Sequence, residues 1–273
     1  MTETQKTLPP TRRYAKIRVS HAPHGAQIVT LFNPERRNAI GPRMINELLY
    51  AIDDAHAHPG GGVRSIVVTG EGKAFCAGGD FAQMTGSGDD GPELPFKGDY
   101  VDLVLAMTRS EIPIIAKVNG HAMGGGIGLV AACTFAIASA DAKLGTPEVD
   151  VGLFPMMIMA VLSRVVPRRR LLEMMILGER MTAEEARAAG IVNTVVPAAE
   201  LDRATGALCA RIEKKSPAAL ALGLRAYADQ ADMDLAAALP MLRDRLAACL
   251  ATEDAREGLM AFLEKRDPVW KGK

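Results

Sequence analysis

Long apolar runs are missing from this chain of 273 residues. A helix that crosses a membrane needs about 18 or more consecutive apolar residues, and no stretch of the sequence reaches that length. The first residues, MTETQKTLPPTRR, also lack the apolar core of a secretion signal. We therefore expect a soluble, cytoplasmic protein without a membrane partner.

A net charge is missing as well, because 32 basic residues balance 32 acidic ones. Such a chain has no overall field that would recruit nucleic acid or an anionic membrane. We expect neither as a partner, and any anionic ligand must be bound by local basic residues.

Cysteine is scarce, and its four positions do not have the spacing of metal ligands. This usage is typical of a reduced cytosolic protein and predicts no metal site. Cys76 lies in a glycine-rich turn, but no histidine motif accompanies it. We interpret it as a small packing residue.

Glycine, by contrast, is concentrated in two turns, GKAFCAGGDF at 72–81 and NGHAMGGGIGLVAACT at 119–134. Each follows a short β-branched run and leads into a segment that can be helical. A helix N-terminus has unpaired N–H groups, and glycine lets a ligand atom approach the backbone. Two such turns can supply one donor each to a single developing oxyanion.

Two nucleotide motifs are alternatives for these turns. A phosphate-binding P-loop is excluded, because no Gly-Lys-Ser/Thr has the required spacing. Gly126, Gly128 and Ala131 match G-x-G-x-x-A, and Glu148 follows about 20 residues later, as in a dinucleotide fingerprint. NGHAMG, however, lies between the strand at 112–118 and these glycines, where the fingerprint has none. The fingerprint remains a minor alternative.

The chain is long enough for one large domain, alone or with a small one. Up to about residue 150, β-type runs alternate with helical patterns, which predicts an α/β core. The strands are expected at 15–20, 26–32, 65–70, 112–118 and 135–140, and the helices at 44–57 and 101–109. The segment 82–99 has no apolar period and indicates either a lid or a plain surface loop.

Beyond about residue 158 the pattern is largely helical. Thr182 and Glu185 form a capping-box pattern, Gly190 is typical of a helix stop, and Pro240 should end or kink a later helix. We divide the chain into a core at 1–205 and a helical region at 206–273. Apolar helices with few aromatics favour packing against another subunit.

Six segments together resemble the enoyl-CoA hydratase/isomerase family, also called the crotonase family. They are LFNPERRNAI (31–40), GKAFCAGGDF (72–81), IPIIAKVNGHAMGGG (112–126), GTPEVDVGLFP (145–155), LGERMTAEEARAAGIVNTVVP (177–197) and EDAREGLMAFLEKRDPVW (253–270). The resemblance implies a spiral of repeated strand–strand–helix units and a C-terminal helical region that assembles homotrimers or dimers of trimers. It also implies an acyl-CoA thioester as the substrate and no separate cofactor.

The resemblance also implies roles for particular residues. The oxyanion donors would be the backbone N–H groups of Gly79 and Gly125, and Glu148 would be the acid/base. The residues expected to bind the coenzyme A part are Arg37, Ala39, Ala77, Phe262 and Lys265. Read without the family, Arg36 is an ordinary solvated charge.

One departure from the family pattern concerns a second carboxylate. Hydration of a 2-enoyl thioester in the family uses two glutamates, and the position of the first is Gly128 here. The resemblance therefore implies isomerisation of 3-enoyl-CoA to 2-enoyl-CoA by Glu148 alone. The related dienoyl-CoA isomerases have aspartates at the positions of Gly128 and Met156, so that activity is not expected.

Two other readings stay open. One is a hydratase of the fatty-acid β-oxidation type that lacks the first glutamate and works slowly, or through another group such as Asp150 by way of water. The other is a non-catalytic protein that binds CoA thioesters. We expect Gly128→Glu to restore some hydration if the backbone there is helical and accepts a side chain.

Four further expectations concern the surroundings of these residues. PMMIMAV (155–161) would either fill core, the favoured reading, or line a flexible acyl pocket. Asp150 would share a face with Glu148 if the segment is extended. Asp80 would cap the next helix, and His121 would be structural.

Overall fold

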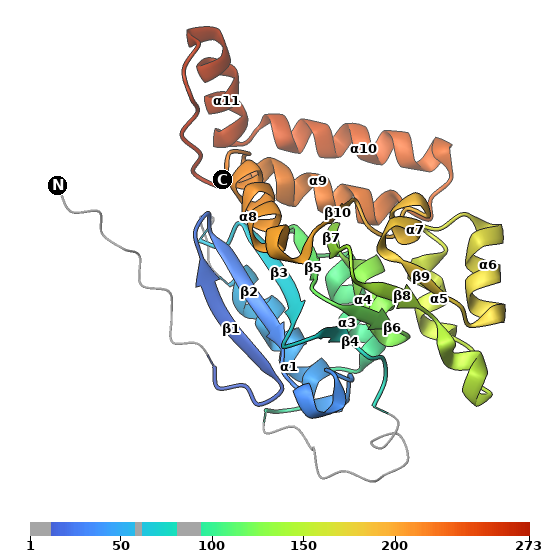
Figure 1. Cartoon of the computed structure of the whole chain (residues 1–273). Coiled ribbons are helices and arrows are strands. Elements are labelled where there is room, and N and C mark those ends of the chain that lie inside the picture. Colours follow the sequence, from blue (N-terminus) through green and yellow to red (C-terminus); the bar gives the residue numbers. More distant parts are fainter. Residues whose placement is uncertain (1–11, 58–61, 81–93) are drawn as a thin grey trace.

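The computed structural model describes residues 12–57, 62–80 and 94–273, and its strands form two sheets (Figure 1). The main sheet has the order β1-β2-β3-β5-β7-β10 and the second sheet the order β4-β6-β8-β9. The main-sheet strands are β1 (Ile17–Ala22), β2 (Ala26–Leu31), β3 (Ser65–Gly70), β5 (Ile114–Val118), β7 (Phe135–Ser139) and β10 (Thr194–Val196). The second sheet contains β4 (Ala74–Cys76), β6 (His121–Met123), β8 (Lys143–Gly145) and β9 (Arg180–Thr182).

Successive strands alternate between the two sheets. β3, β5 and β7 belong to the main sheet, whereas β4, β6 and β8 follow them in the chain and pair in parallel in the second sheet. In the main sheet only β1 and β2 are antiparallel. This alternation is the spiral of strand–strand–helix units that the family resemblance implies.

Helices cover the sheets and extend beyond them. The α-helices are α1 (Pro42–His56), α3 (Tyr100–Thr108), α4 (Gly125–Ala132), α5 (Met156–Leu162), α6 (Arg168–Leu177), α7 (Ala183–Ala188), α8 (Leu201–Glu213), α9 (Pro217–Gln230), α10 (Leu235–Leu250) and α11 (Glu253–Glu264). Short 3-10 helices are η1 (Pro34–Arg36), η2 (Pro147–Val151) and η3 (Ala198–Glu200). The strands and helices expected in the first half of the chain are all present.

The core lies between the main sheet and the helices α1, α3 and α4. All six residues of β3 are buried, which is typical of a central parallel strand covered on both faces. Ile66, Ile114 and Leu129 are fully buried there together with Phe75 of the second sheet. This packing fixes the ends of the strands from which the glycine-rich turns emerge.

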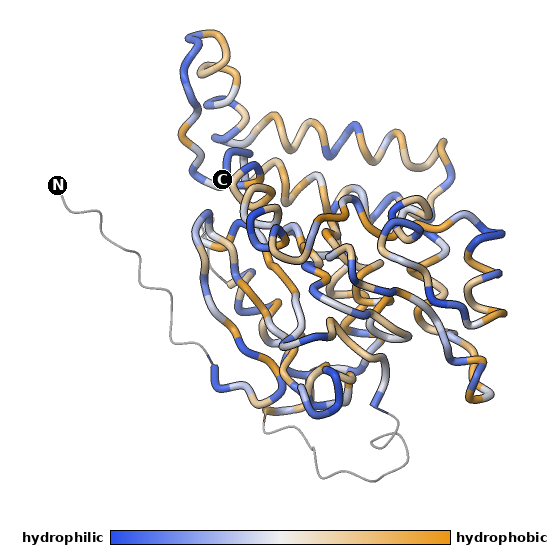
Figure 2. Tube along the Cα trace, viewed as in Figure 1, coloured by the Kyte–Doolittle hydropathy of each residue, from blue (hydrophilic) through white to orange (hydrophobic). Residues whose placement is uncertain are grey.

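The C-terminal helices lie on one side of the sheets, and α11 projects beyond them (Figure 1). α8 packs on the main sheet through Cys209 and Ile212, and it contains the predicted domain boundary at residue 205. Apolar and polar residues alternate along α9, α10 and α11 (Figure 2). Several of the apolar side chains are exposed in a single chain, among them Tyr227, Leu235, Leu239, Leu246, Leu250, Leu259, Phe262 and Leu263.

The local signals of the second half are mostly confirmed. Thr182 and Glu185 form the predicted capping box at α7, and Gly190 has a φ of 88° just beyond that helix. Pro240 does not end a helix, because it lies in the second turn of α10, which continues to Leu250. A proline there removes its own N–H bond and crowds the carbonyl oxygen four residues earlier. Packing against α9 helps to hold the helix despite this cost.

Residues 82–93 of the predicted loop at 82–99 lie outside the described residues. The choice between a lid and a plain surface loop is therefore not tested. Within the described ranges, no helix has the length and apolar character needed to cross a membrane.

Candidate active site

The first glycine-rich turn follows β4 and is held by Ile40. The Ile40 N–H donates to the carbonyl oxygen of Gly78 at 2.7 Å, and the Asp80 N–H donates to the carbonyl oxygen of Ile40 at 2.9 Å. This parallel bridge uses the groups on either side of Gly79, so the Gly79 N–H is directed away from Ile40. Among the described residues it has no acceptor.

The second glycine-rich turn joins β6 to α4. Gly124 has a φ of 50°, a conformation that favours glycine, and its N–H donates to the carbonyl oxygen of Gly145 at 2.9 Å. Gly125 is the first residue of α4, where a backbone N–H has no partner within the helix. Its N–H also has no acceptor in the described part of the chain.

Glu148 lies in η2 and its carboxylate approaches the second turn. A Cβ atom added at Gly124 would lie 2.9 Å from the Glu148 Oε1 atom, so only glycine allows this approach. The Oε2 atom is buried and has no hydrogen-bond partner in the described ranges. Burial raises the pKa of Glu148, and a backbone hydrogen bond opposes this in part.

Gly79, Gly125 and Glu148 meet in one cavity of about 220 Å³. The remaining residues that line it are Ile40, Ile45, Tyr100, Leu153, Phe154, Pro155, Met156, Met157 and Ile158. Glu148 is therefore the only carboxylate among the described residues of the lining. Two N–H donors can polarise a thioester carbonyl, and a carboxylate with a raised pKa can then move protons at the neighbouring carbon.

The methionines after Pro155 do not all fill core. Met156 is 64% exposed and Met157 is 51% exposed, and both line the cavity. The core interpretation is wrong for these two, because they are exposed, whereas Ile158 and Val161 of the same helix are buried. Flexible thioether side chains at the mouth of the cavity suit an apolar ligand of variable shape.

The position of the missing glutamate is occupied by other side chains. Gly128 is buried in α4, and a Cβ atom there would lie 2.4 Å from Cγ2 of Ile158 and 2.5 Å from the Tyr100 hydroxyl oxygen. The backbone is helical, as the expected rescue required, but the space for a side chain is filled. The second condition for Gly128→Glu to restore hydration, that the position accepts a side chain, is therefore not met.

We predict instead that Gly128→Glu lowers the melting temperature and produces no hydratase activity, because the new side chain displaces Ile158 and Tyr100. Gly206→Glu is the matched control, since Gly206 is also helical and nothing lies within 4 Å of its added Cβ. Thermal unfolding and the hydration of a 2-enoyl-CoA check both variants. A Gly128→Glu protein as stable as the control would contradict the packing argument.

The five residues predicted to bind coenzyme A fall into two groups. Arg37, Ala39 and Ala77 lie beside the first turn, where the Ala77 N–H donates to the carbonyl oxygen of Arg37 at 3.0 Å. Phe262, which is 81% exposed, and Lys265 belong to α11 and its C-cap, and α11 projects away from β4 and α1 (Figure 1). Within one chain the structure brings together only the first group.

Three expectations about polar residues are tested by the structure. Arg36 is not simply solvated, because it donates two hydrogen bonds to the buried Asp80, at 2.7 and 2.8 Å. The helix that Asp80 is expected to cap falls outside the described residues. Asp150 is exposed and does not share the face of Glu148, because the segment is a 3-10 helix. His121 is structural, since its Nδ1 accepts from the Lys143 N–H at 3.1 Å.

Cys76 is a packing residue, as expected. It is fully buried, and burial raises the pKa of its thiol to about 12. Its Sγ atom accepts from the Gly78 N–H at 3.4 Å, so it also shapes the first turn. In the described part of the chain, no three His, Cys, Asp or Glu side chains form a group that could hold a metal ion.

Tyr100 is the residue that sequence reasoning missed. It begins α3, is 9% exposed and lines the cavity beside Gly125. No motif surrounds it. The one usable signal was that an aromatic residue opens a helix in a chain with only four tyrosines.

The arrangement of two glycine-rich turns, each following a strand of the second sheet and lining one cavity, belongs to the crotonase fold. The sequence profile described as enoyl-CoA hydratase/isomerase matches residues 22–273. The chain belongs to that family of enzymes.

Known proteins similar to this chain agree with that assignment. It is 33% identical to the human mitochondrial enoyl-CoA hydratase domain-containing protein 3, over 90% of this chain and 80% of that protein. It is 35% identical to a probable enoyl-CoA hydratase of Bacillus subtilis strain 168, over 90% of this chain and 95% of that protein. The crystal structure of the human protein superimposes with a TM-score of 0.85 at 32% identity, covering 94% of this chain and 100% of that one.

Proposed function

We propose that the protein isomerises 3-enoyl-CoA thioesters to 2-enoyl-CoA thioesters, with Glu148 as the single acid/base. The observation that carries the proposal is that Glu148 is the only carboxylate among the described residues that line the cavity, while packed side chains fill the space beside Gly128. Hydration needs one group that activates the water and another that delivers the proton to C2. Isomerisation needs only one base, which takes a proton from C2 and returns it to C4.

The proposed reaction is balanced within the substrate. Glu148 takes a proton from C2, and the electron pair of that C–H bond forms a dienolate whose oxygen accepts hydrogen bonds from the Gly79 and Gly125 N–H groups. The same carboxyl group then returns the proton to C4, so the double bond moves from C3–C4 to C2–C3. The apolar lining excludes water that would compete for the proton.

The raised pKa of Glu148 predicts the acid limb of the pH profile. The base must be deprotonated, so kcat/KM should rise with pH through the pKa of the free enzyme's Glu148. Because burial raises that pKa above the ordinary value of 4.5, the limb should lie at higher pH than for an exposed glutamate. A pH profile of isomerisation measures it, and a midpoint below that of a free glutamate would contradict the proposed environment.

A hydratase is the second candidate, because similar proteins, such as that of Bacillus subtilis, are named as probable enoyl-CoA hydratases. One experiment separates the readings: purified protein is incubated with 2-enoyl-CoA and, separately, with 3-enoyl-CoA in heavy water, and the products are followed by NMR. An isomerase converts 3-enoyl-CoA to 2-enoyl-CoA faster than it hydrates 2-enoyl-CoA. A hydratase instead forms the 3-hydroxyacyl product rapidly from 2-enoyl-CoA. A protein that only binds CoA thioesters leaves both substrates unchanged.

We also propose that Phe262 and Lys265 reach the nucleotide part of coenzyme A in a homotrimer or dimer of trimers. Both residues belong to α11 and its C-cap, and α11 projects away from β4 and α4 in Figure 1, so a second copy of the chain would supply them. The exposed apolar side chains of α9, α10 and α11 support such an assembly.

Lys265→Asn should weaken CoA binding up to about fivefold, the effect of one exposed charge pair, and leave the oligomer intact. Asparagine tolerates the left-handed conformation of Lys265, which has a φ of 54°. Lys265→Arg keeps the charge and is the matched control. Calorimetric titration with CoA and size-exclusion chromatography measure the two properties, and unchanged affinity in Lys265→Asn would refute this role.

A further inference from the structure

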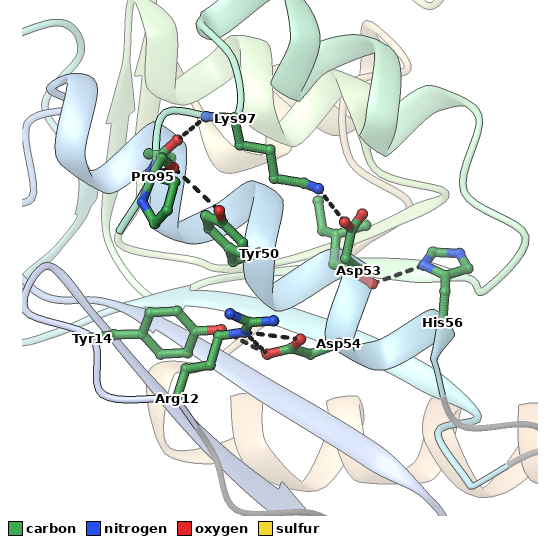
Figure 3. Close-up of polar contacts among 10 residues, drawn as sticks. Arg12, Tyr14, Tyr50, Asp53, Asp54, His56, Pro95 and Lys97 are labelled. Atoms are coloured by element: carbon green, nitrogen blue, oxygen red, sulfur yellow. Dashed lines mark hydrogen bonds and ion pairs between the residues drawn. The ribbon is translucent and has the colours of Figure 1, made fainter. Parts of the chain in front are cut away.

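Tyr100 is held in place by the segment that precedes it. Residues 94–97 are tied to α1, because the Asn46 side chain accepts from the Lys97 N–H at 2.7 Å and donates to the carbonyl oxygen of Pro95 at 3.0 Å. Tyr50 donates to the same Pro95 oxygen, and Lys97 forms an ion pair with Asp53 (Figure 3). The anchored segment fixes the start of α3.

The helix start itself is also well defined. Asp99 and Asp102 form a capping box, so Tyr100 occupies the first position of α3 in a fixed direction. From there the Tyr100 hydroxyl donates to the carbonyl oxygen of Gly125 at 2.7 Å. Burial raises the pKa of Tyr100, so the hydroxyl stays protonated and able to donate at any working pH.

The second glycine-rich turn needs such a restraint. Gly124, Gly125 and Gly126 are three consecutive glycines, the residues with the widest backbone freedom. Gly124 is held through its bond to Gly145, and Gly126 packs closely on Cys76. Between them, the bond to Tyr100 is the side-chain contact that holds Gly125.

We propose that Tyr100 is a positioning residue of the oxyanion hole: its bond to the Gly125 carbonyl holds the first turn of α4 so that the Gly125 N–H is directed into the cavity. This inference rests on the proposed oxyanion hole but not on which reaction follows enolate formation. Tyr100 thus acts by holding the Gly125 backbone, in addition to packing beside Gly128.

Tyr100→Phe tests the proposal, because it keeps the ring and removes only the hydroxyl. We expect kcat to fall about 10- to 100-fold, a part of the 10²–10³-fold loss typical for removal of a whole oxyanion donor. KM should stay within about twofold, since the apolar lining is unchanged. Tyr14→Phe is the matched control: the Tyr14 hydroxyl donates to Asp54 on α1, away from the cavity (Figure 3).

A spectroscopic measurement separates positioning from simple packing. Acetoacetyl-CoA forms an enolate that absorbs in the near ultraviolet, and the oxyanion donors should stabilise this enolate on the protein. Tyr100→Phe should reduce the bound enolate signal, whereas Tyr14→Phe should retain it. The signal does not depend on isomerisation, so it remains informative if the protein proves to be a hydratase.

Two results would overturn the proposal. One is a Tyr100→Phe protein with the kcat and enolate signal of the wild type. The other is a variant whose melting temperature falls while its remaining folded fraction gives the full enolate signal, which would show a structural role only. Labelling the wild type with 3-fluorotyrosine gives an independent readout, because the ¹⁹F resonance of Tyr100 should shift when acetoacetyl-CoA binds.

Discussion

Glu148→Gln should abolish isomerisation and exchange of the C2 proton together. Glutamine keeps the shape of the side chain and cannot accept the proton, and general acid–base catalysis typically contributes about 10²–10⁴-fold. We expect the upper end of that range, because no second carboxylate among the described residues lines the cavity. NMR in heavy water measures both rates in one sample.

Asp150→Asn is the matched control for this variant. Asp150 lies in the same 3-10 helix as Glu148 but is exposed and outside the cavity lining. It should retain wild-type isomerisation. A large loss of activity in Asp150→Asn, or full activity in Glu148→Gln, would contradict the assignment of Glu148 as the sole base.

The same substitution has an expected effect on stability. The folded protein raises the pKa of Glu148, so its charged form is disfavoured and the contribution of this group to stability is lost as pH rises through that pKa. Above it, Glu148→Gln removes a half-buried charge. The variant should therefore melt at the same or a higher temperature than the wild type at neutral pH. That result would exclude unfolding as the cause of inactivity.

Gly125→Pro should lower turnover by roughly 10²–10³-fold, the typical loss for one oxyanion donor. Proline removes the N–H and is otherwise well tolerated at the first position of a helix, which Gly125 occupies. The reduction should appear in kcat more than in KM, because the hydrogen bond strengthens as charge develops on the oxygen.

Gly125→Ala is the control that keeps the donor. An added Cβ would lie 3.5 Å from Ile40 and 3.7 Å from Tyr100, which are ordinary contact distances. Its turnover should be much closer to that of the wild type. If a folded Gly125→Pro protein turned over as fast as Gly125→Ala, the Gly125 N–H would not be part of the oxyanion hole.

Much of the fold could be predicted from the sequence because its signals are local. Continuous apolar runs such as SIVVTG specify buried strands, and the capping box at Thr182 specifies a helix start. Pro240 shows the limit of such reasoning. Its effect depends on where α10 begins and on packing against α9, and neither follows from the proline itself.

The parts of the candidate site that depend on backbone motifs could be predicted from the sequence. The parts that depend on how the helices pack could not. Gly79, Gly125 and Glu148 lie in motifs that the sequence displays, and the structure brings them into one cavity. The contents of the space beside Gly128 depend on how α3 and α5 meet α4, which brings together Tyr100 and Ile158 from distant parts of the chain. The spacing of residues along the sequence does not show that these two side chains come together.

The alternation of strands between the two sheets has a consequence for how this enzyme can change. The two donor turns follow β4 and β6, which are neighbours in the second sheet, so the separation of the two N–H groups is set by strand register. The side chains around the ligand come from other elements, including α3 and α5. Substitutions in α5 can alter which acyl group fits, while the two proposed oxyanion donors, which are main-chain groups, keep their separation.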